Sequence, residues 1–490
     1  MNEELETSLA APPALGAPYR LKENVIGPWG LAALAIGVTS PAMGLYSLWG
    51  IMQSETGPVT PLIFLAATVL TLPTAISYAL LNQHVPSAGA ASTWLWKALS
   101  RTAGFQAGLL MATYFAMGVV DCPLLFAMFF NDFLRLLGAP ISSTLSLCLG
   151  VLVSTVPIAI LCLRGAEASV KTTVRLMLIE TLVVVALSLT ILIAKWPTPG
   201  GISLSPFDPR QLSNGMSGFW SAMILGVLSF CGFDVVSTAA EEAHAPRKHV
   251  PQAILIAIIG MGLFWAANAW VFTLSTPVRE VLEYTRLGLP AVTLVAQSYW
   301  GWGSLIITFT AFTATIAIYI SIVQGASRIV FALARHRLMP SPFARLVGAR
   351  RVPRNAILGV LACAVFVDLA TISVLRNGVD SYNWWASAIV FFATLTFMGV
   401  NLANVLYFSR LARRDFGVVK NLLLPLAGLA LNAYLLYAAF FSTLWSSDFR
   451  MGKSVVIGCL ALLGAEVVVV LSMRVFARHL FEQEAPLGAV

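Results

Sequence analysis

The sequence predicts an all-α polytopic membrane protein with about twelve transmembrane helices, and three observations support this prediction. Of the 490 residues, 58% are apolar and 11% are charged, whereas about a quarter of the residues of a soluble domain are charged. Apolar runs recur from about residue 28 to residue 476, and they reach the roughly 20 residues that a helix needs to cross a membrane. Two of these runs are interrupted near their centres.

The runs define one membrane domain, residues 28–476, between tails at residues 1–27 and 477–490 that we expect in the cytosol. The third and eighth spans are long enough to tilt or to project beyond the bilayer. The twelve predicted spans are residues 28–52, 58–82, 103–136, 142–163, 170–194, 216–241, 250–275, 301–335, 354–375, 383–409, 420–443 and 453–476.

The basic residues orient these spans. The chain has 30 Lys and Arg against 22 Asp and Glu, which gives a formal net charge of +8. With both termini inside, most basic residues fall in cytosolic segments, and the loop after the eighth span holds the densest group. Basic loops stay on the cytosolic side of a membrane. We therefore expect a multi-pass protein of the cell inner membrane in contact with lipid, and the charge requires no nucleic-acid partner.

The residue types that hold metals or perform nucleophilic chemistry are scattered. The six cysteines lie inside apolar runs without paired spacing, and the five histidines fall at cytosolic span ends or in loops. The sequence has no histidine–glutamate zinc motif, no glycine-flanked serine and no phosphate-binding glycine loop with lysine. We expect no metal, no cofactor, no catalytic residues and no ATP-driven step.

The first span is interrupted at its centre by Gly37–Gly44, where a proline stands among small residues. Proline removes a backbone donor and leaves groups that hydrocarbon cannot satisfy. Such a break is expected beside a cavity or a bound solute, although an ordinary kink is the alternative. The predicted substrate-binding residues of this span are Thr39, Ser40, Pro41, Ala42, Met43 and Gly44.

The sixth span has a matching interruption with a glycine and a carboxylate at lipid depth. Two broken helices in corresponding halves of a chain indicate the central site of a transporter. Either break alone is equally well explained as a kink, because Pro73, Pro123 and Pro157 also lie inside spans. The two phenylalanines of this break either gate the solute or pack in the core. The predicted site residues are Phe230, Cys231, Gly232, Phe233 and Asp234.

The half-helix ends favour a zwitterion or an amine as the solute. The outer half of the first span begins near Met43, and its free N–H groups and positive dipole end suit a carboxylate. The outer half of the sixth span ends near Phe230, and its unpaired carbonyls suit an ammonium group. The expected partner is therefore a small amino acid or an amine.

Acidic side chains inside spans are functional candidates, because an ionisable group is costly at that depth. Asp234 either contacts substrate or caps the inner half of the sixth helix. Asp121 either binds a basic group of the substrate or pairs with a neighbour. Glu180 either couples protons to transport or makes a structural hydrogen bond. Asp368 and Glu466 lie away from the predicted site and are expected to be structural.

Several stretches resemble the amino acid, polyamine and organocation permeases. Gly232–Asp234 followed by Glu241–Ala253 is similar to the family's sixth helix and the loop after it. Two further stretches agree with the family: Pro86–Trp94 leading into Gly104–Gly108, and Ser327–Arg335 ending at Met339 and Pro340. The resemblance extends over about residues 20–475, and it is closest to bacterial importers of putrescine, related amines and amino acids.

The resemblance implies a fold and a way of working. Five plus five helices form an inverted repeat, at about residues 28–194 and 216–409, and two further helices at about 420–476 are peripheral. Access to the substrate alternates around the first and sixth helices. Sodium-coupled relatives would use hydroxyls of the eighth helix, where this chain offers Ser321 alone. Coupling to protons, or exchange, is therefore expected.

One position departs from the family. Several proton-coupled members have a lysine in the middle of the fifth helix, and the matching position here, counted from Gly165–Ser169, is Glu180. The lysine mechanism is not carried over. A buried glutamate can still hold and release a proton, because burial disfavours its charged form.

The predicted function is secondary active transport of a small amino acid or an amine. A polyamine or ethanolamine importer on the same fold is the alternative. A membrane sensor is less favoured because the tails are short for a signalling domain, and an intramembrane enzyme because no nucleophile–base pair is recognisable. The residues leave open the exact substrate, uptake or exchange, the coupling ion and the oligomeric state.

Overall fold

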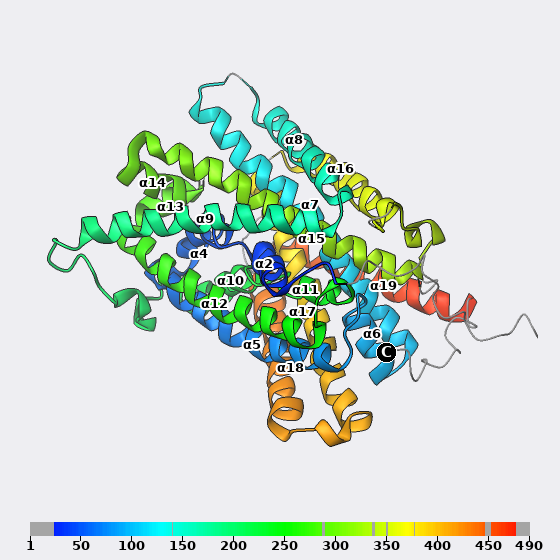
Figure 1. The fold of residues 1–490 in the computed structure, drawn as a ribbon. Helices are drawn as coiled ribbons and strands as arrows, with labels where there is room; N and C mark the ends of the chain where they lie inside the picture. The colour runs from blue at the N-terminus through cyan, green and yellow to red at the C-terminus, as the bar shows by residue number, and fades with distance from the viewer. Residues whose placement is uncertain are drawn as a thin grey trace, which may run out of the picture.

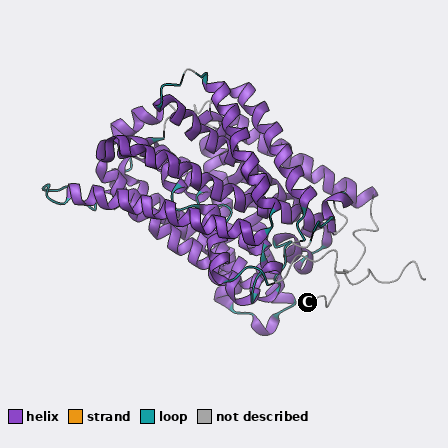
Figure 2. Ribbon diagram, turned by 45° about the horizontal axis from the view of Figure 1, so that its top comes forward, coloured by secondary structure: helices purple, strands orange, loops and turns teal. Residues whose placement is uncertain are grey.

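The computed structural model describes residues 24–139, 141–286, 290–335, 339–348, 351–376, 378–445 and 452–476. Helices dominate these residues, and the described segments contain no strand (Figure 2). The predicted tail 477–490, and the predicted tail 1–27 except for residues 24–27, lie outside them.

Eleven helices of the described residues are long and apolar enough to cross a membrane. They correspond to all predicted spans except the sixth, whose helix is broken into α10 (Gly215–Leu228) and α11 (Val235–Thr238). The predicted fold class, an all-α polytopic membrane protein, is confirmed.

The first half of the domain begins with a divided span. Proline stands in the first turn of α2 and of α5, where its missing N–H costs nothing. Ser142 caps α8 by accepting a hydrogen bond from the Leu145 N–H. The helices are α2 (Pro28–Thr39), α3 (Met43–Tyr46), α4 (Trp49–Thr56), α5 (Thr60–His84), α6 (Ala91–Ala98), α7 (Arg101–Leu136), α8 (Ser143–Leu163) and α9 (Ala166–Lys195).

The second half starts at α10 and α11 and has the same order of long helices. Two short helices, α13 and α14, precede its third long helix. The last two spans come after the second half, and the first of these two is π-helical at both ends, at Val419–Leu423 and Leu436–Leu444. The remaining helices are α12 (Pro246–Ser275), α13 (Val278–Arg286), α14 (Ala291–Trp300), α15 (Leu305–Arg335), α16 (Arg354–Leu375), α17 (Gly378–Arg410), α18 (Leu424–Leu435) and α19 (Gly452–Phe476).

Short 3₁₀ turns join several of these helices. The turn that matters most for the site follows α11 and contains two glutamates. These turns are Gly57–Val59, Ser205–Phe207, Pro209–Gln211, Ala240–Glu242, Gly301–Ser304, Ser341–Ala344 and Arg413–Asp415.

Equivalent helices of the two halves pack against each other. α5 packs on α12, α7 on α15, and α8 on α16, and the last pair lies side by side at one edge of the bundle (Figure 1). α7 also packs on α17, and α15 on α9. In a five-plus-five repeat, the third and tenth helices correspond to the eighth and fifth. The contact of α7 with α17 therefore corresponds to that of α15 with α9, and the packing agrees with the predicted arrangement.

The outer helices present apolar side chains to the outside. On α9, α16 and α19 the exposed residues include Leu182, Ile193, Phe366 and Val468. A surface of this kind is unfavourable in water and suits hydrocarbon. α2 lies at the centre of the bundle in Figure 1 and is packed against α9, α12 and α15. The interrupted first helix is therefore enclosed by protein.

Candidate functional site

The break in the first helix lies where the sequence predicts it. α2 ends at Thr39, and the chain turns at Ser40, whose φ is +42°. A positive φ is uncommon for a residue other than glycine. The Ser40 N–H still donates to the Ile36 carbonyl at 2.7 Å, and the next residue, Pro41, has no N–H to satisfy. α3 then begins at Met43.

Glu180 of α9 joins the two sides of this break. Its Oε2 accepts hydrogen bonds from the Ser40 hydroxyl at 2.6 Å and from the Ala42 N–H at 3.4 Å. The Ser40 hydroxyl oxygen accepts from the Met43 N–H at 3.1 Å. Two N–H groups that were expected to be free for a substrate carboxylate are therefore bonded within the protein. Glu180 itself is fully buried.

The break in the sixth helix satisfies its backbone through tight turns. The Phe230 N–H donates to the Val227 carbonyl at 3.0 Å, and the Phe233 N–H donates to the Phe230 carbonyl at 3.2 Å. Gly232 has a φ of +100°, which glycine adopts readily because it has no Cβ. The Val235 N–H then donates to the Gly232 carbonyl at 2.9 Å, and α11 begins.

The two breaks touch each other at Gly232. A Cβ atom placed there would lie 2.0 Å from Cγ1 of Val38 on α2, far closer than two carbon atoms can approach. At Gly44, after the first break, an added Cβ atom would lie 2.7 Å from the Trp265 ring of α12, which is also too close. Both glycines are therefore required by close packing around the breaks.

Asp234 does not cap the inner half of the sixth helix. Its side chain makes no cap hydrogen bond. Instead its carboxylate accepts from the Tyr78 hydroxyl of α5 at 3.0 Å and from the Tyr114 hydroxyl of α7. The expectation of a cap is wrong because two tyrosines of neighbouring helices reach the carboxylate. Asp234 thereby ties the sixth helix to α5 and α7.

The two phenylalanines of the break pack in the core. Phe230 meets the Trp265 ring, with ring centres 5.1 Å apart. Phe233 meets Tyr78 at 5.3 Å and Phe397 at 5.5 Å. Both phenylalanines are fully buried, and neither borders the cavity described next. Of the two alternatives, core packing is the one observed.

A cavity of about 80 Å³ lies beside the two breaks. It is bordered by five predicted residues: Thr39, Met43, Gly44, Asp121 and Cys231. The other predicted residues, namely Ser40, Pro41, Ala42, Phe230, Gly232, Phe233, Asp234 and Glu180, do not border it. These residues form the breaks themselves or, in the case of Glu180, make hydrogen bonds to a break.

Most of the cavity wall comes from residues that sequence reasoning missed. On α7 the spacing of Gly118, Asp121, Cys122 and Leu125 is that of one helix face, which was a usable signal. Tyr382 lies ahead of the predicted start of the tenth span, so it was not considered. The missed wall residues are Val38, Ser47, Leu48, Tyr114, Gly118, Cys122, Leu125, Leu228, Ser229, Ile318, Ile322, Tyr382 and Ile389.

The remaining membrane carboxylates divide into two cases. Glu466 of α19 accepts hydrogen bonds from Gln106 at 3.3 Å and from Thr113, which is the structural role expected of it. Asp368 of α16 is completely buried and does not border the cavity, which agrees with the expectation that it lies away from the site. Neither of its carboxylate oxygens has a hydrogen-bond partner among the described residues.

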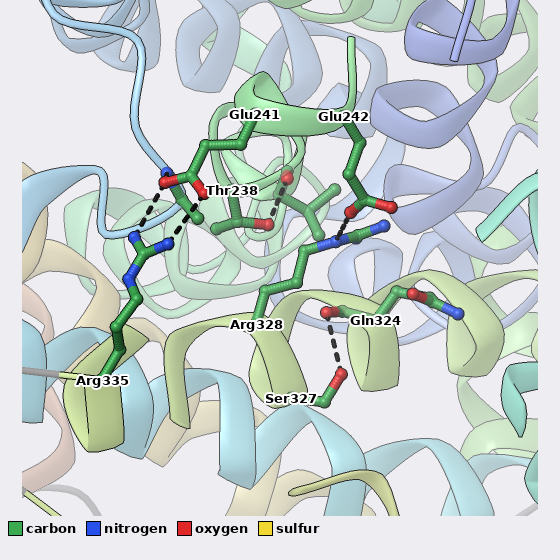
Figure 3. Close-up of polar contacts among 9 residues, drawn as sticks. Thr238, Glu241, Glu242, Gln324, Ser327, Arg328 and Arg335 are labelled. Carbon is green, nitrogen blue, oxygen red and sulfur yellow. Dashed lines mark hydrogen bonds and ion pairs between the residues drawn. The ribbon is translucent and has the colours of Figure 1, made fainter. Parts of the chain in front are cut away.

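Two ion pairs join the loop after the sixth helix to α15 (Figure 3). Nε of Arg328 donates to Glu242 at 2.5 Å, and both residues are buried. Arg335 binds Glu241 through two N–H···O bonds, at 2.9 and 3.1 Å. Removing one partner of a buried pair costs about 3–5 kcal/mol. Two of the stretches that resemble the permease family, Glu241–Ala253 and Ser327–Arg335, therefore meet in space.

The chain just before α2 is fastened to the same loop. The N–H groups of Val25 and Ile26 donate to the Glu242 carbonyl at 2.9 and 3.1 Å. The His244 N–H donates back to the Ile26 carbonyl at 2.9 Å. The first helix, the sixth helix and α15 are thus linked at one end of the bundle, which is the end predicted to face the cytosol.

Comparison with known proteins identifies the family. A family model described as amino acid permease matches residues 26–465. The chain therefore belongs to the amino acid permeases, in the superfamily that its motifs resemble.

The similar proteins are transporters. The branched-chain amino acid permease BcaP of Bacillus subtilis (strain 168) is 24% identical over 71% of this chain and 78% of its own length. BcaP of Lactococcus lactis subsp. cremoris (strain MG1363) is 24% identical over 68% of this chain and 73% of its own. The L-methionine/branched-chain amino acid exporter YjeH of Escherichia coli (strain K12) is 25% identical over 66% and 72%.

These findings confirm the prediction of an amino acid transporter and do not favour the polyamine, ethanolamine or sensor alternatives. With eleven apolar helices, the chain is a multi-pass membrane protein.

The contact at Gly232 yields a first prediction. Gly232→Leu should insert into the membrane at near wild-type amounts and reduce uptake to background, because the new side chain collides with Val38 and opposes a φ of +100°. Gly260→Leu is the matched control, since nothing lies within 4 Å of a Cβ at that position of α12. Uptake by liposomes and binding to purified protein are measured for both. Unchanged substrate affinity in Gly232→Leu would place the site elsewhere.

Proposed function

We propose that the protein is a secondary active transporter for amino acids with apolar side chains, and that alternating access takes place around the breaks of the first and sixth helices. The main support is the cavity that borders both breaks. Part of its wall is aliphatic, with Val38, Leu125, Ile318 and Ile322 among its residues. An apolar wall of this kind is stabilised by an apolar side chain and does not compensate a charged one.

The polar part of the same cavity fits the two charges that every amino acid has. Leu228 and Ser229 border it at the C-terminal end of α10, where a helix has partial negative charge that favours an ammonium group. Met43 and Gly44 border it after the first break, on the side where the positive end of the outer half-helix suits a carboxylate. The amino and carboxyl groups would lie at the breaks, and the side chain would lie against the aliphatic wall.

The ion pairs at one end of the bundle provide the gate for this mechanism. Opening a path to that end requires α11 and the loop after it to separate from α15, which breaks the Arg328–Glu242 and Arg335–Glu241 pairs. Loss of such pairs must be offset by new interactions in the other state, so the two states stay discrete. The basic loops support the proposal that this end faces the cytosol, with the protein in the plasma membrane and both termini inside.

Uptake by liposomes tests the function. Purified protein in liposomes is offered labelled leucine, isoleucine, valine, methionine, lysine, putrescine and ethanolamine, with and without an imposed inward proton gradient. We expect uptake of the neutral apolar amino acids and their accumulation when the gradient is present. Empty liposomes and the Gly232→Leu protein provide the controls. Uptake of putrescine or ethanolamine without any neutral amino acid would overturn the proposed substrate class.

Glu180 is the proposed coupling residue, because among the described residues it is the one carboxylate bonded directly to the broken first helix. Protonation would weaken its hold on the Ala42 N–H and on Ser40, and so change the energy of moving that helix. Glu180→Gln imitates the protonated form permanently. It should retain exchange of internal for external substrate and lose accumulation driven by a proton gradient.

Glu180→Ala separates this role from a structural one. It removes the acceptor for two buried donors and should lower stability by about 1–3 kcal/mol, measured as a lower melting temperature in detergent. Exchange and gradient-driven uptake are measured side by side for the glutamine variant. Accumulation by Glu180→Gln at the wild-type level and with wild-type pH dependence would leave Glu180 with a structural hydrogen bond only.

A further inference from the structure

Asp121 is, among the described residues, the one charged side chain in the wall of the cavity beside the helix breaks. It is 7% exposed, and its Oδ1 has no hydrogen-bond partner. No ion pair of the described residues includes it. A buried carboxylate without a partner is unfavourable, and the mechanism above gives this one no role. The cavity therefore has a negative group in its wall and no basic residue to compensate it.

The packing of α7 directs Asp121 toward this cavity. α7 passes so close to α15 that a Cβ atom added at Gly118 would lie 2.9 Å from the side chain of Ile322. Asp121 follows Gly118 by three residues, and Leu125 follows it by seven. This spacing keeps all three on one face of the helix, and all three border the cavity. The carboxylate is thus held inside the protein, away from lipid.

The break in the sixth helix adds acceptors to the same wall. Ser229 and Cys231 both border the cavity. The Ser229 N–H donates to the Leu225 carbonyl at 3.0 Å, and the Cys231 N–H donates to the Leu228 carbonyl at 2.9 Å. The carbonyl oxygens of Ser229 and Cys231 themselves accept no backbone hydrogen bond from the described residues. Carbonyls at the C-terminal end of a helix have partial negative charge, so they attract the same kind of ligand as Asp121.

An ammonium group fits this wall better than a metal cation. It has one positive charge and three N–H donors, which match a carboxylate and free carbonyl oxygens. A metal cation needs several ligands arranged around it, and the described residues contain no group of three or more His, Cys, Asp or Glu that could hold one. Every amino acid has an α-ammonium group. A second positive charge, on a basic side chain, would meet the aliphatic part of the wall and stay uncompensated.

We propose that Asp121 is the counter-ion of the substrate's α-ammonium group, which it binds together with the carbonyl end of the sixth-helix break. The inference rests on the proposed function, because it assigns one contact in the site of an amino acid transporter. Binding of the ammonium group neutralises the wall, and release of the substrate leaves the carboxylate to water that enters the cavity. The site therefore requires a charged amino group and rejects a solute that has the carboxyl group alone.

Leucine analogues that lack one of the two charges test this contact in the wild-type protein. Isopentylamine keeps the ammonium group of leucine and has no carboxylate, whereas 4-methylpentanoate keeps the carboxylate and has no ammonium group. Each is added to liposomes that take up labelled leucine. We expect isopentylamine to inhibit uptake at a concentration about tenfold or more below that of 4-methylpentanoate. Equal inhibition by the two, or stronger inhibition by the acid, would overturn the proposal.

Asp121→Asn removes the charge and keeps the size of the side chain. It should raise the KM for leucine about tenfold or more and abolish the preference for isopentylamine. Asp121→Glu keeps the charge and should retain more of this preference than Asp121→Asn. Asp368→Asn is the matched control, because Asp368 is a buried carboxylate that does not border the cavity, and its KM should stay within about twofold of wild type. An unchanged KM in Asp121→Asn, or an equal rise in Asp368→Asn, would contradict the assignment.

Two other roles of the carboxylate would give different results. If Asp121 carried a transported proton, Asp121→Asn would keep the wild-type affinity for leucine and lose accumulation driven by a proton gradient. If it bound Na⁺, leucine uptake by the wild-type protein would require Na⁺, and Asp121→Asn would remove this requirement. Either result would assign the negative wall to another cation and exclude the ammonium contact.

A binding measurement separates this inference from the proposed function. If wild-type liposomes transport no amino acid, the proposed function fails, and calorimetric titration of purified protein with isopentylamine still tests the cation site. Tighter binding to wild type than to Asp121→Asn supports the site, and equal or absent binding excludes it. If leucine is transported and Asp121→Asn keeps the wild-type KM, the function stands and the role of Asp121 is excluded. Should Asp121→Asn not fold, the analogue comparison on wild-type protein decides.

Discussion

Every backbone N–H and carbonyl at membrane depth must find a partner inside the protein, and the rest of this structure depends on how two broken helices meet that requirement. In the first helix, Glu180 and Ser40 receive the N–H groups that the break exposes. In the sixth helix, successive tight turns through Gly232 satisfy the chain locally. One solution uses a titratable side chain and the other uses none, which is the reason that Glu180 is the proposed coupling residue.

The two helix breaks are in contact with each other, and this contact lies between the cavity and the ion pairs on α15. Gly232 lies against Val38, without room for even a Cβ atom between them. On one side of this contact is the cavity, with Asp121 in its wall. At one end of the bundle, the ion pairs of Arg328 and Arg335 join the sixth helix to α15. In the proposed mechanism, a change at the cavity reaches these ion pairs through packed helices.

Much of the fold could be predicted from the sequence, because hydrocarbon imposes length and composition on every span. Both breaks were predictable too, since Pro41 and Gly232 interrupt apolar runs. The directions in which the side chains point could not be predicted. Tyr78 and Tyr114 belong to other helices, and nothing in the local sequence shows that they reach Asp234 and replace its expected role as a cap. Likewise, apolar runs have no polar face from which to predict that Phe230 and Phe233 point into the core.

If substrate binds in the cavity beside the two breaks, it should protect Cys231 from chemical modification. Cys231 is a free cysteine that lies in the second break and on the cavity wall. In a protein that keeps Cys231 and has the other five cysteines replaced, the rate of alkylation by a small thiol reagent is measured with and without a saturating transported amino acid. The account predicts that bound substrate slows the reaction at least severalfold. An unchanged rate in protein that still transports that amino acid would contradict it.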